Sequence, residues 1–452
     1  MQKRANKLRV SPELFTLIRS SGGLLLFRVV GMLCGLTFTI LLARTMDQTA
    51  VGQVTAGFSL AMLLAMVTTL NIGAGELRFL VAYLAEKDIR RAAGFVSTGR
   101  RIALFTSLLI LLPVAGVFAA HRLGYPTVAP SHLLLSLIAA VILGWLRLNS
   151  SLVHAHGHVL LARIPESLLR PAFMLISLAI GLAMGSHFDS TDIMVLFVTN
   201  LALVGLIQKI TTQNIMSPLY NESMPDYSHI RDWVKVGIQV MIPLLFLQYS
   251  LDTIVVLSAR VLSPAEVAIL GIILRISGFI LFAVSAVDMA VGPRLAHEIH
   301  TGNNIAANRL LALSGHLKFW PVLIGCGLLA FFGEWVLGIF GEKYQSGVDA
   351  LRMLTAIPLI LAFFGPTTLL VNILKLQAQS LIVFLISIVI LALMLVYLGS
   401  LYRIEGVVLS MLVTWFFWNI VLYLIIRVKT GYEASMIGAI RWVFSKNKLL
   451  NN

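Results

Sequence analysis

Long apolar runs recur along this chain of 452 residues and leave little polar sequence between them. Of its residues, 58% are hydrophobic and only 12% are charged, and the mean hydropathy is +0.92. A soluble domain is roughly 45–50% apolar and about 25% charged. A continuous apolar run of roughly 20 residues spans the hydrocarbon core of a bilayer as a helix. The sequence therefore predicts an all-α, polytopic membrane protein without a soluble domain of any size.

About twelve spans are predicted, arranged as two lobes of six helices each, a plan found in many secondary transporters. The predicted spans cover approximately 21–43, 52–73, 102–121, 132–153, 166–185, 191–209, 235–257, 265–291, 319–340, 350–374, 380–399 and 406–426. The predicted divisions are a cytoplasmic tail with an interfacial helix (1–20), an N-terminal lobe (21–209), a cytoplasmic linker (210–234), a C-terminal lobe (235–426) and a cytoplasmic basic tail (427–452).

The distribution of Lys and Arg predicts the orientation of these spans. With a cytoplasmic N-terminus, 25 of the 34 Lys and Arg residues lie in inner segments, 6 in outer loops and 3 within spans. Because cytoplasmic loops carry the excess of basic residues, both termini are predicted to be cytoplasmic. The formal charge of +14 has the same explanation, and no aromatic and basic stretch suggests a nucleic-acid partner.

A faint internal repeat agrees with two similar halves. Ala43-Arg44 is followed seven residues later by Val51, and Ala259-Arg260 is followed at the same spacing by Val267. Both pairs come at the predicted outer turn after the first span of a lobe. The distance along the sequence from the first pair to the second is the one expected from a duplication of six spans.

Charged residues inside predicted spans are the main indication of a functional site. The hairpin of spans 235–257 and 265–291, joined by a turn at Ser258–Pro264, carries Asp252, Arg275 and Asp288. A charge near the bilayer centre costs at least ~2.5–3.5 kcal/mol on insertion scales, so such residues usually face a bundle interior or a watery cavity. Arg275 lies near the predicted midplane, whereas Arg147 is close enough to an inner helix end to reach the interface.

Two interpretations of these charges stay open at this point. They form ion pairs that brace the bundle, or they form a cationic cavity with Arg28 and Arg275 at its centre and Arg147 and Arg170 at its inner mouth. An Arg guanidinium suits a phosphate or carboxylate, because its planar fork binds two oxygens at once. Asp252 and Asp288 are candidates for ion pairing or for ion coupling. Weaker candidates for hydrogen bonds within spans are Gln248, Asn200, Asn372 and Thr367.

The sequence shows no catalytic motif. It contains no phosphate-binding GxxxxGK[ST], no HExxH and no GxSxG, so no enzyme activity is expected and any transport is driven by a gradient. His154, His156 and His158 alternate along the chain and do not share a helix face, so we expect no metal site there. Cys34 and Cys326 sit within apolar runs as packing residues. No cofactor is expected.

Two turns give the chain a resemblance to a known family. The segments Leu41-Leu42-Ala43-Arg44 with Val51-Gly52, and Phe340-Gly341-Glu342-Lys343-Tyr344, together with twelve spans in two halves, resemble the polysaccharide-transporter branch of the multidrug/oligosaccharidyl-lipid/polysaccharide (MOP) exporter superfamily. Within that branch the chain looks most like O-antigen flippases.

The resemblance implies a MATE-like fold and a place in the bacterial inner membrane. It implies that the protein moves an undecaprenyl-pyrophosphate-linked oligosaccharide outward by alternating access, for O-antigen, lipopolysaccharide or other surface polysaccharide synthesis. The expected partners are this lipid-linked substrate, membrane lipids and the polysaccharide polymerase machinery. Arg28 in the first span and Arg275 in the eighth match the cationic cavity of the family by position.

Two other functions remain as alternatives. A cation-coupled multidrug exporter is one of them, but such exporters typically carry an acid in the first span, where this chain has Arg28. Dependence of drug export on Asp252 would favour that alternative. The other is a membrane scaffold without transport activity, which unchanged glycan export after loss of both cavity arginines would favour.

Overall fold

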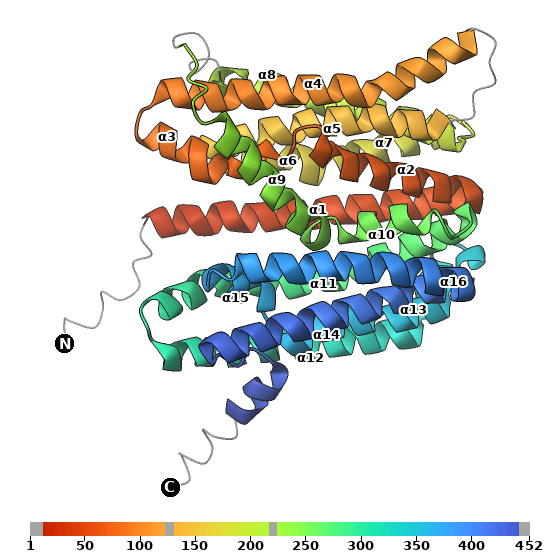
Figure 1. Cartoon of the computed structure of the whole chain (residues 1–452). Coiled ribbons are helices and arrows are strands. Elements are labelled where there is room, and N and C mark those ends of the chain that lie inside the picture. Colours follow the sequence, from red (N-terminus) through yellow and green to blue (C-terminus); the bar gives the residue numbers. More distant parts are fainter. Residues whose placement is uncertain (1–11, 123–130, 217–223, 443–452) are drawn as a thin grey trace. The chain divides into compact units, whose positions relative to one another are not determined.

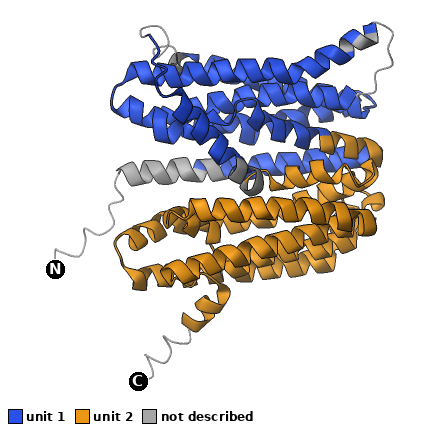
Figure 2. Cartoon of the chain, viewed as in Figure 1, with its two compact units in different colours: residues 1–46, 57–245 blue, residues 47–56, 246–452 orange. Residues whose placement is uncertain are grey.

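The computed structural model describes residues 12–122, 131–216 and 224–442, and within these ranges the chain is helical without strands (Figure 1). Ten of the described helices or helical segments are long and apolar enough to cross a membrane. The chain divides into two compact units (Figure 2). Unit 1 comprises residues 1–46 and 57–245, and unit 2 comprises residues 47–56 and 246–452.

Unit 1 is built from helices of the N-terminal half of the chain. They are α1 (Pro12–Thr45), most of α2 (Gln48–Val67), η1 (Ile72–Gly75), η2 (Glu76–Leu80), α3 (Val81–Ala85), α4 (Ile89–Arg122), α5 (Ser131–Ala155), α6 (Val159–Ile164), η3 (Pro165–Leu169), α7 (Arg170–Ala183), α8 (Ser190–Met216) and most of α9 (Ile230–Leu247). Here η1 is a 3₁₀ helix, and η2 and η3 are π-helical turns.

Unit 2 contains the remaining helices and the first residues of α2. Its helices are α10 (Ser250–Ser258), α11 (Pro264–His300), α12 (Asn304–Gly338), η5 (Glu342–Gly347), α13 (Val348–Leu354), α14 (Ala356–Phe364), α15 (Thr367–Ile373) and α16 (Gln377–Thr430).

The ten segments account for eleven of the twelve predicted spans. Nine predicted spans have one counterpart each, and the predicted spans 380–399 and 406–426 both lie within α16. The two stretches of α16 meet at Arg403, whose φ of 54° and ψ of −126° are not helical. The predicted turn at 400–405 is therefore a break at one residue.

The predicted span 235–257 is not one continuous helix. It consists of α9 and the short helix α10, which are separated at Gln248 and Tyr249. The backbone of Tyr249, with φ −116° and ψ 20°, lies outside helical geometry, and its carbonyl accepts a hydrogen bond from the Thr253 hydroxyl at 2.9 Å. The Thr253 N–H donates to the same carbonyl at 2.9 Å, so Tyr249 marks the start of α10. The turn predicted at Ser258–Pro264 is confirmed, because α10 ends at Ser258 and α11 begins at Pro264.

A glycine allows α1 to pack closely against the irregular segment η3 in unit 1. A Cβ at Gly31 would overlap the Ser167 carbonyl group and meet the Pro171 ring at 3.4 Å. Pro171 has no N–H, so it cannot donate the usual helical hydrogen bond to that carbonyl. Small residues let membrane helices approach in this way. Gly31 thus sets the distance between α1 and the start of α7.

The segment that leads into α9 is fixed to α3 and α4 in unit 1. The Trp233 side chain is fully buried in a cluster with Phe95 and Tyr83, and its indole donates to the Tyr83 hydroxyl at 3.2 Å. The Asp226 backbone N–H donates to Arg90 O at 3.0 Å. Residues 224–233, which fall in the predicted linker, therefore pack as part of unit 1.

In unit 2, the start of α11 is tied to the break in α16. Ser263 and Glu266 form a capping box, an arrangement that satisfies orphan backbone donors at a helix start. The same Glu266 carboxylate accepts two hydrogen bonds from Arg403, one of them at 2.8 Å. The backbone of Arg403 has a positive φ, and its guanidinium group lies at the α10–α11 turn, where it binds Glu266.

The chain after α16 packs back on unit 2. Glu433 accepts a hydrogen bond from the Tyr423 hydroxyl at 2.8 Å and forms an ion pair with Arg427. Residues 436–442 form a short helix whose Met436 and Ala439 are buried, while its Ile437 and Ile440 are exposed. The basic residues Lys446 and Lys448 of the predicted basic tail fall outside the described residues.

We predict that Gly31→Ala lowers the free energy of unfolding by about 1–3 kcal/mol, because the new methyl group has no room beside the Ser167 carbonyl. The measurement is thermal unfolding of the purified protein in detergent. The control is Gly205→Ala, where a Cβ meets nothing within 4 Å; loss of a helical glycine there should stabilise the protein by roughly 0.5–1 kcal/mol. Equal melting temperatures for the two variants would contradict the packing described here.

Candidate functional site

An arginine on α5 and a glutamate on η3 form a hydrogen-bonded ion pair inside unit 1. Arg147 Nε and Nη2 both donate to Glu166 Oε1, at 3.1 and 2.9 Å. Arg147 Nη1 donates to the backbone carbonyl of Met62 on α2 at 3.0 Å. The Arg147 side chain keeps 15% of its exposure. Arg147 therefore points toward η3 and α2 within unit 1, and its place near the inner interface stays a prediction.

The π-helical turn η3 places Glu166 opposite Arg147. The turn begins at Pro165 and closes with a hydrogen bond from the Arg170 N–H to Pro165 O. One extra residue per turn rotates the following side chains relative to an α-helix, and such turns are frequent at functional sites. Because Pro165 and Pro171 each lack an N–H, the helix here cannot keep its regular hydrogen bonds. The two prolines thus explain why the chain departs from α-helical geometry at this point.

Two further arginines lie around the same glutamate. Arg170 Nη1 lies 3.2 Å from Met62 Sδ, the sulfur that Arg147 Nη2 also approaches at 3.1 Å. Arg163, on the last turn of α6, is within electrostatic range of Glu166. Glu166 is thus the carboxylate that three arginines share.

Arg28 on α1 joins this group through Arg163. The two guanidinium groups are close enough to repel each other, and α1 is held near η3 by the contact of Gly31 with Ser167. We call Arg28, Arg147, Arg163, Arg170 and Glu166 the arginine cluster. The structure brings three of the four predicted cavity arginines into this cluster.

The arginine cluster carries an excess of positive charge within apolar helices. Four guanidinium groups and one carboxylate leave a formal excess of three positive charges. Arg28 is exposed and Arg170 is half-buried. Charged residues within membrane-spanning segments usually mark a path for a substrate or an ion. An anion with several oxygens, such as a phosphate, matches the fork of donors that each guanidinium offers.

The predicted charges of the second half lie in unit 2. Arg275 on α11 and Asp252 on α10 are both half-buried. Asp288 on α11 forms an ion pair with Lys318 on α12, whose side chain is fully buried. Lys318 was predicted to lie in an inner loop, but α12 begins at Asn304 and carries it into the bundle. Arg275 and the arginine cluster belong to different units, so a cavity shared by them stays a prediction.

The weaker polar candidates make ordinary contacts between and within helices. Asn200 donates to the Ser177 hydroxyl and to Leu196 O, both at 2.9 Å. The Thr367 hydroxyl donates to Asn419 Oδ1 at 3.3 Å. Gln248 and Asn372 are exposed. For Asn200 and Thr367, the contacts are those that hold membrane helices together.

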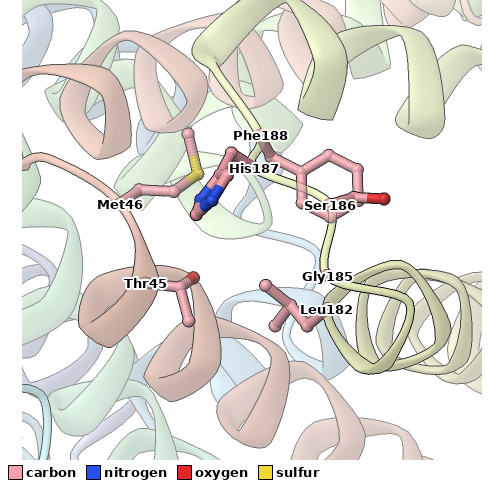
Figure 3. A pocket seen from close by; sticks show the side chains of 7 residues that line it. All are labelled: Thr45, Met46, Leu182, Gly185, Ser186, His187 and Phe188. Atoms are coloured by element: carbon pink, nitrogen blue, oxygen red, sulfur yellow. The ribbon is translucent and has the colours of Figure 1, made fainter.

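A pocket of about 350 Å³ opens at the other end of unit 1, between the end of α1 and the α7–α8 turn (Figure 3). Met46 follows the end of α1 and His187 lies in the α7–α8 turn, and both side chains line the pocket (Figure 3). Its lining residues are Thr45, Met46, Leu182, Gly185, Ser186, His187 and Phe188. Thr45 is 17 residues after Arg28 on one helix, which is ~25 Å at 1.5 Å per residue. This pocket is therefore separate from the arginine cluster.

Glu166 and Arg163 are not among the site residues predicted from the sequence. Both lie at the predicted inner end of the fifth span, where charged residues usually belong to a loop. The Pro165-Glu166 pair and Pro171 could have indicated an irregular helix, because proline inside an apolar run frees backbone groups. Arg147 meets Glu166 because α5 packs against η3, and no spacing of residues in the sequence indicates that packing.

We predict that Glu166→Gln destabilises unit 1, because it removes a counter-charge of Arg147. The expected loss is about 1–3 kcal/mol, below the roughly 3–5 kcal/mol of a fully buried pair, since Glu166 keeps about a third of its exposure. The measurement is thermal unfolding in detergent.

A double variant provides the control for this prediction. Arg147→Met combined with Glu166→Gln should recover most of the loss, because both charges of the pair are then removed together. Glu86→Gln, at an exposed position after α3, should leave the melting temperature unchanged. Equal melting temperatures for Glu166→Gln and the wild type would contradict the role given to this pair.

No protein-family model matches the chain, and no curated protein matches it. Several solved structures are similar to this chain. An inward-facing multidrug resistance MATE family transporter of the MOP superfamily has a TM-score of 0.70 at 14% identity, over 88% of this chain and 94% of that one. The MATE multidrug transporter DinF-BH has a TM-score of 0.63 at 18% identity, over 92% of this chain and 95% of that one.

A MOP superfamily transporter from Pyrococcus furiosus is also similar, with a TM-score of 0.56 at 14% identity, over 89% of this chain and 94% of that one. It is described as having a reversed binding-pocket polarity that suggests a different function. At these identities the likeness concerns the fold. The predicted MATE-like, all-α fold is thereby confirmed: this chain has the fold of the MATE transporters of the MOP superfamily.

Proposed function

We propose that this protein is a flippase that moves an undecaprenyl-pyrophosphate-linked oligosaccharide across the bacterial inner membrane by alternating access, for O-antigen or other surface polysaccharide synthesis. The observation that carries the proposal is the arginine cluster, with four arginines and one glutamate inside apolar helices. The fold supports a transporter, since the similar solved structures are described as transporters.

The chemistry of the substrate headgroup fits this cluster. A pyrophosphate offers several anionic oxygens, and a guanidinium binds two oxygens of such a group at once. Glu166 occupies two donors of Arg147, so this arginine also has the role of holding the cluster together. Arg28, which is exposed, is the cluster member best placed to meet a headgroup. Arg275 in unit 2 is the proposed contact from the second half of the chain.

The positive charge of the arginine cluster also distinguishes a flippase from a multidrug exporter. DinF-BH is described as a multidrug transporter, so the fold serves that function in other proteins. In the P. furiosus transporter, the polarity of the pocket is what suggests a different function. By the same argument, an arginine-rich cluster favours an anionic substrate over a cation. If this protein exports cationic drugs instead, Asp252 is the residue on which that transport would depend.

The experiment is carried out in a host from which the gene is deleted and then restored as variants. Both surface polysaccharide and the lipid-linked repeat unit inside the cell are measured. Loss of surface glycan with inner accumulation of the lipid-linked unit is the result expected from the deletion. Normal glycan together with altered sensitivity to cationic drugs would contradict the flippase and favour the multidrug exporter.

We predict that Arg28→Ala and Arg275→Ala each remove most of the transport while protein abundance stays near normal. The matched control is Arg260→Ala, which changes an exposed arginine between α10 and α11. Since its position is in the predicted outer turn, glycan export should not change. Wild-type export in both cavity variants would contradict the assignment and favour a scaffold without transport activity.

Arg275→Lys tests whether geometry or charge is needed at this position. We predict only partial recovery of export relative to Arg275→Ala, because an ammonium is a point charge and lacks the planar fork that binds two oxygens. The same surface-glycan assay provides the measurement. Full recovery would mean that positive charge alone is sufficient there.

A further inference from the structure

One side of α4 carries large apolar side chains that the rest of the described chain leaves exposed. The opposite side of this helix is buried: Ala103 is fully buried, and Ser107 accepts a hydrogen bond from the Trp145 indole at 3.2 Å. In a membrane span, an exposed apolar side of this size faces the acyl chains of lipids. Its residues, each between 56% and 69% exposed, are Leu104, Phe105, Leu108, Leu109 and Leu112.

An arginine lies at one end of this apolar side. Arg101 is exposed, and Leu104, Phe105 and Leu108 follow it at spacings that place side chains on one face of a helix. It is the last charged residue of the predicted inner segment before the third span, and none follows until Arg122. From Arg101 to Leu112 the helix rises ~16 Å, about half of a ~30 Å hydrocarbon core. The exposed side thus matches the depth of one leaflet.

An aromatic ring holds the guanidinium group of Arg101 in place. Arg101 Cζ lies 4.9 Å from the centroid of the Tyr227 ring. The Tyr227 hydroxyl accepts a hydrogen bond from Ser97 Oγ at 3.2 Å, so the ring is itself fixed to α4 one turn before Arg101. Attraction between a cation and an aromatic face orients the guanidinium group without using its N–H donors on an oxygen.

Within the part of the chain that the structure describes, Arg101 has no carboxylate or carbonyl partner. Arg91 on the same helix differs, because its Nε lies 3.4 Å from Asp88 and 3.6 Å from Asp226. The five N–H donors of Arg101 are therefore available to an anion from outside the chain. A phosphate suits them, because the planar fork of a guanidinium group binds two of its oxygens at once.

We propose that this side of α4 binds an anionic glycerophospholipid of the surrounding inner leaflet. Arg101 binds the phosphate of the headgroup, and the acyl chains lie along the apolar residues from Leu104 to Leu112. This lipid is distinct from the transported substrate, because no residue of α4 belongs to the arginine cluster. The inference goes beyond the proposed function and holds independently of it.

The bound lipid also acts on the segment that leads into α9, because Tyr227 belongs to that segment. The segment lies directly on α4, where a Cβ at Gly94 would overlap the carbonyl group of Asp226. A phosphate that holds Arg101 over the Tyr227 ring therefore favours docking of residues 224–233 on α4.

Photo-crosslinking locates the lipid on the chain. The full chain is placed in phosphatidylcholine vesicles with a trace of phosphatidylglycerol or phosphatidylcholine that carries the same diazirine in its acyl chain. Trypsin cleaves after arginine and lysine, so the exposed side of α4 is recovered in one peptide, residues 102–122. In the wild type this peptide should be labelled preferentially by phosphatidylglycerol. The peptide 319–343 of α12, whose Leu328, Phe331 and Trp335 are also exposed, should show no such preference.

Arg101→Ala tests the role of the guanidinium group. The preference for phosphatidylglycerol on the α4 peptide should fall by about fivefold, the effect of one basic residue at an anionic membrane surface. The matched control is Arg260→Ala, which also changes an exposed arginine and should keep the wild-type preference. An equal preference in Arg101→Ala and the wild type, or no preference in the wild type, would overturn the proposal.

Two variants of Tyr227 test the ring in the same assay. Tyr227→Phe keeps the aromatic face and should keep the preference, whereas Tyr227→Leu should lower it although every charge is kept. A full preference in Tyr227→Leu would contradict the role given to the ring.

A soluble headgroup distinguishes the lipid from a free phosphate. Excess glycerol 3-phosphate, which has the phosphate without the chains, should leave the labelling unchanged, and displacement of the lipid by it would contradict a lipid site. Size-exclusion profiles identify any variant that does not fold. If Arg101→Ala is among them, Arg101→Lys tests the site, and an intermediate preference is expected because an ammonium group lacks the planar fork.

Discussion

The ion pair of Arg147 with Glu166 is the interaction on which the rest of unit 1 depends. It joins α5 to η3 and, through the Met62 carbonyl, to α2. Moving an arginine into apolar surroundings is costly unless its donors are satisfied. With the pair in place, the bundle can hold Arg28, Arg163 and Arg170 nearby. The excess of positive charge that we assign to substrate binding is thus possible because one carboxylate is fixed beside three of the four arginines.

Irregular backbone positions these charges. The π turn η3 holds Glu166 between two prolines, and Gly31 brings α1 against it. A second π turn, η2, holds Glu76 next to His154. In a membrane, irregular backbone is tolerated where it is buried in protein or lines a cavity. Each of the two π turns carries a glutamate, and Arg163 lies within electrostatic range of both glutamates.

The all-α fold and most spans were predictable because a bilayer requires long apolar runs. The α9–α10 break was not, because it falls at Gln248 and Tyr249, neither of which is a proline or a glycine. Arg28, Arg147, Arg170 and Asp288 could be selected as charges within spans. Their partners could not: Glu166 and Lys318 lie near predicted span ends, and only the packing of neighbouring helices brings them to Arg147 and Asp288.

The central claim is that the arginine cluster binds an anionic lipid headgroup, and binding to the purified chain tests it most directly. Native mass spectrometry in detergent can compare undecaprenyl pyrophosphate with undecaprenol, which has the same tail without the charge. The account predicts preferential retention of the pyrophosphate lipid and loss of this preference in Arg28→Ala. Equal retention of both lipids by the wild type would contradict it.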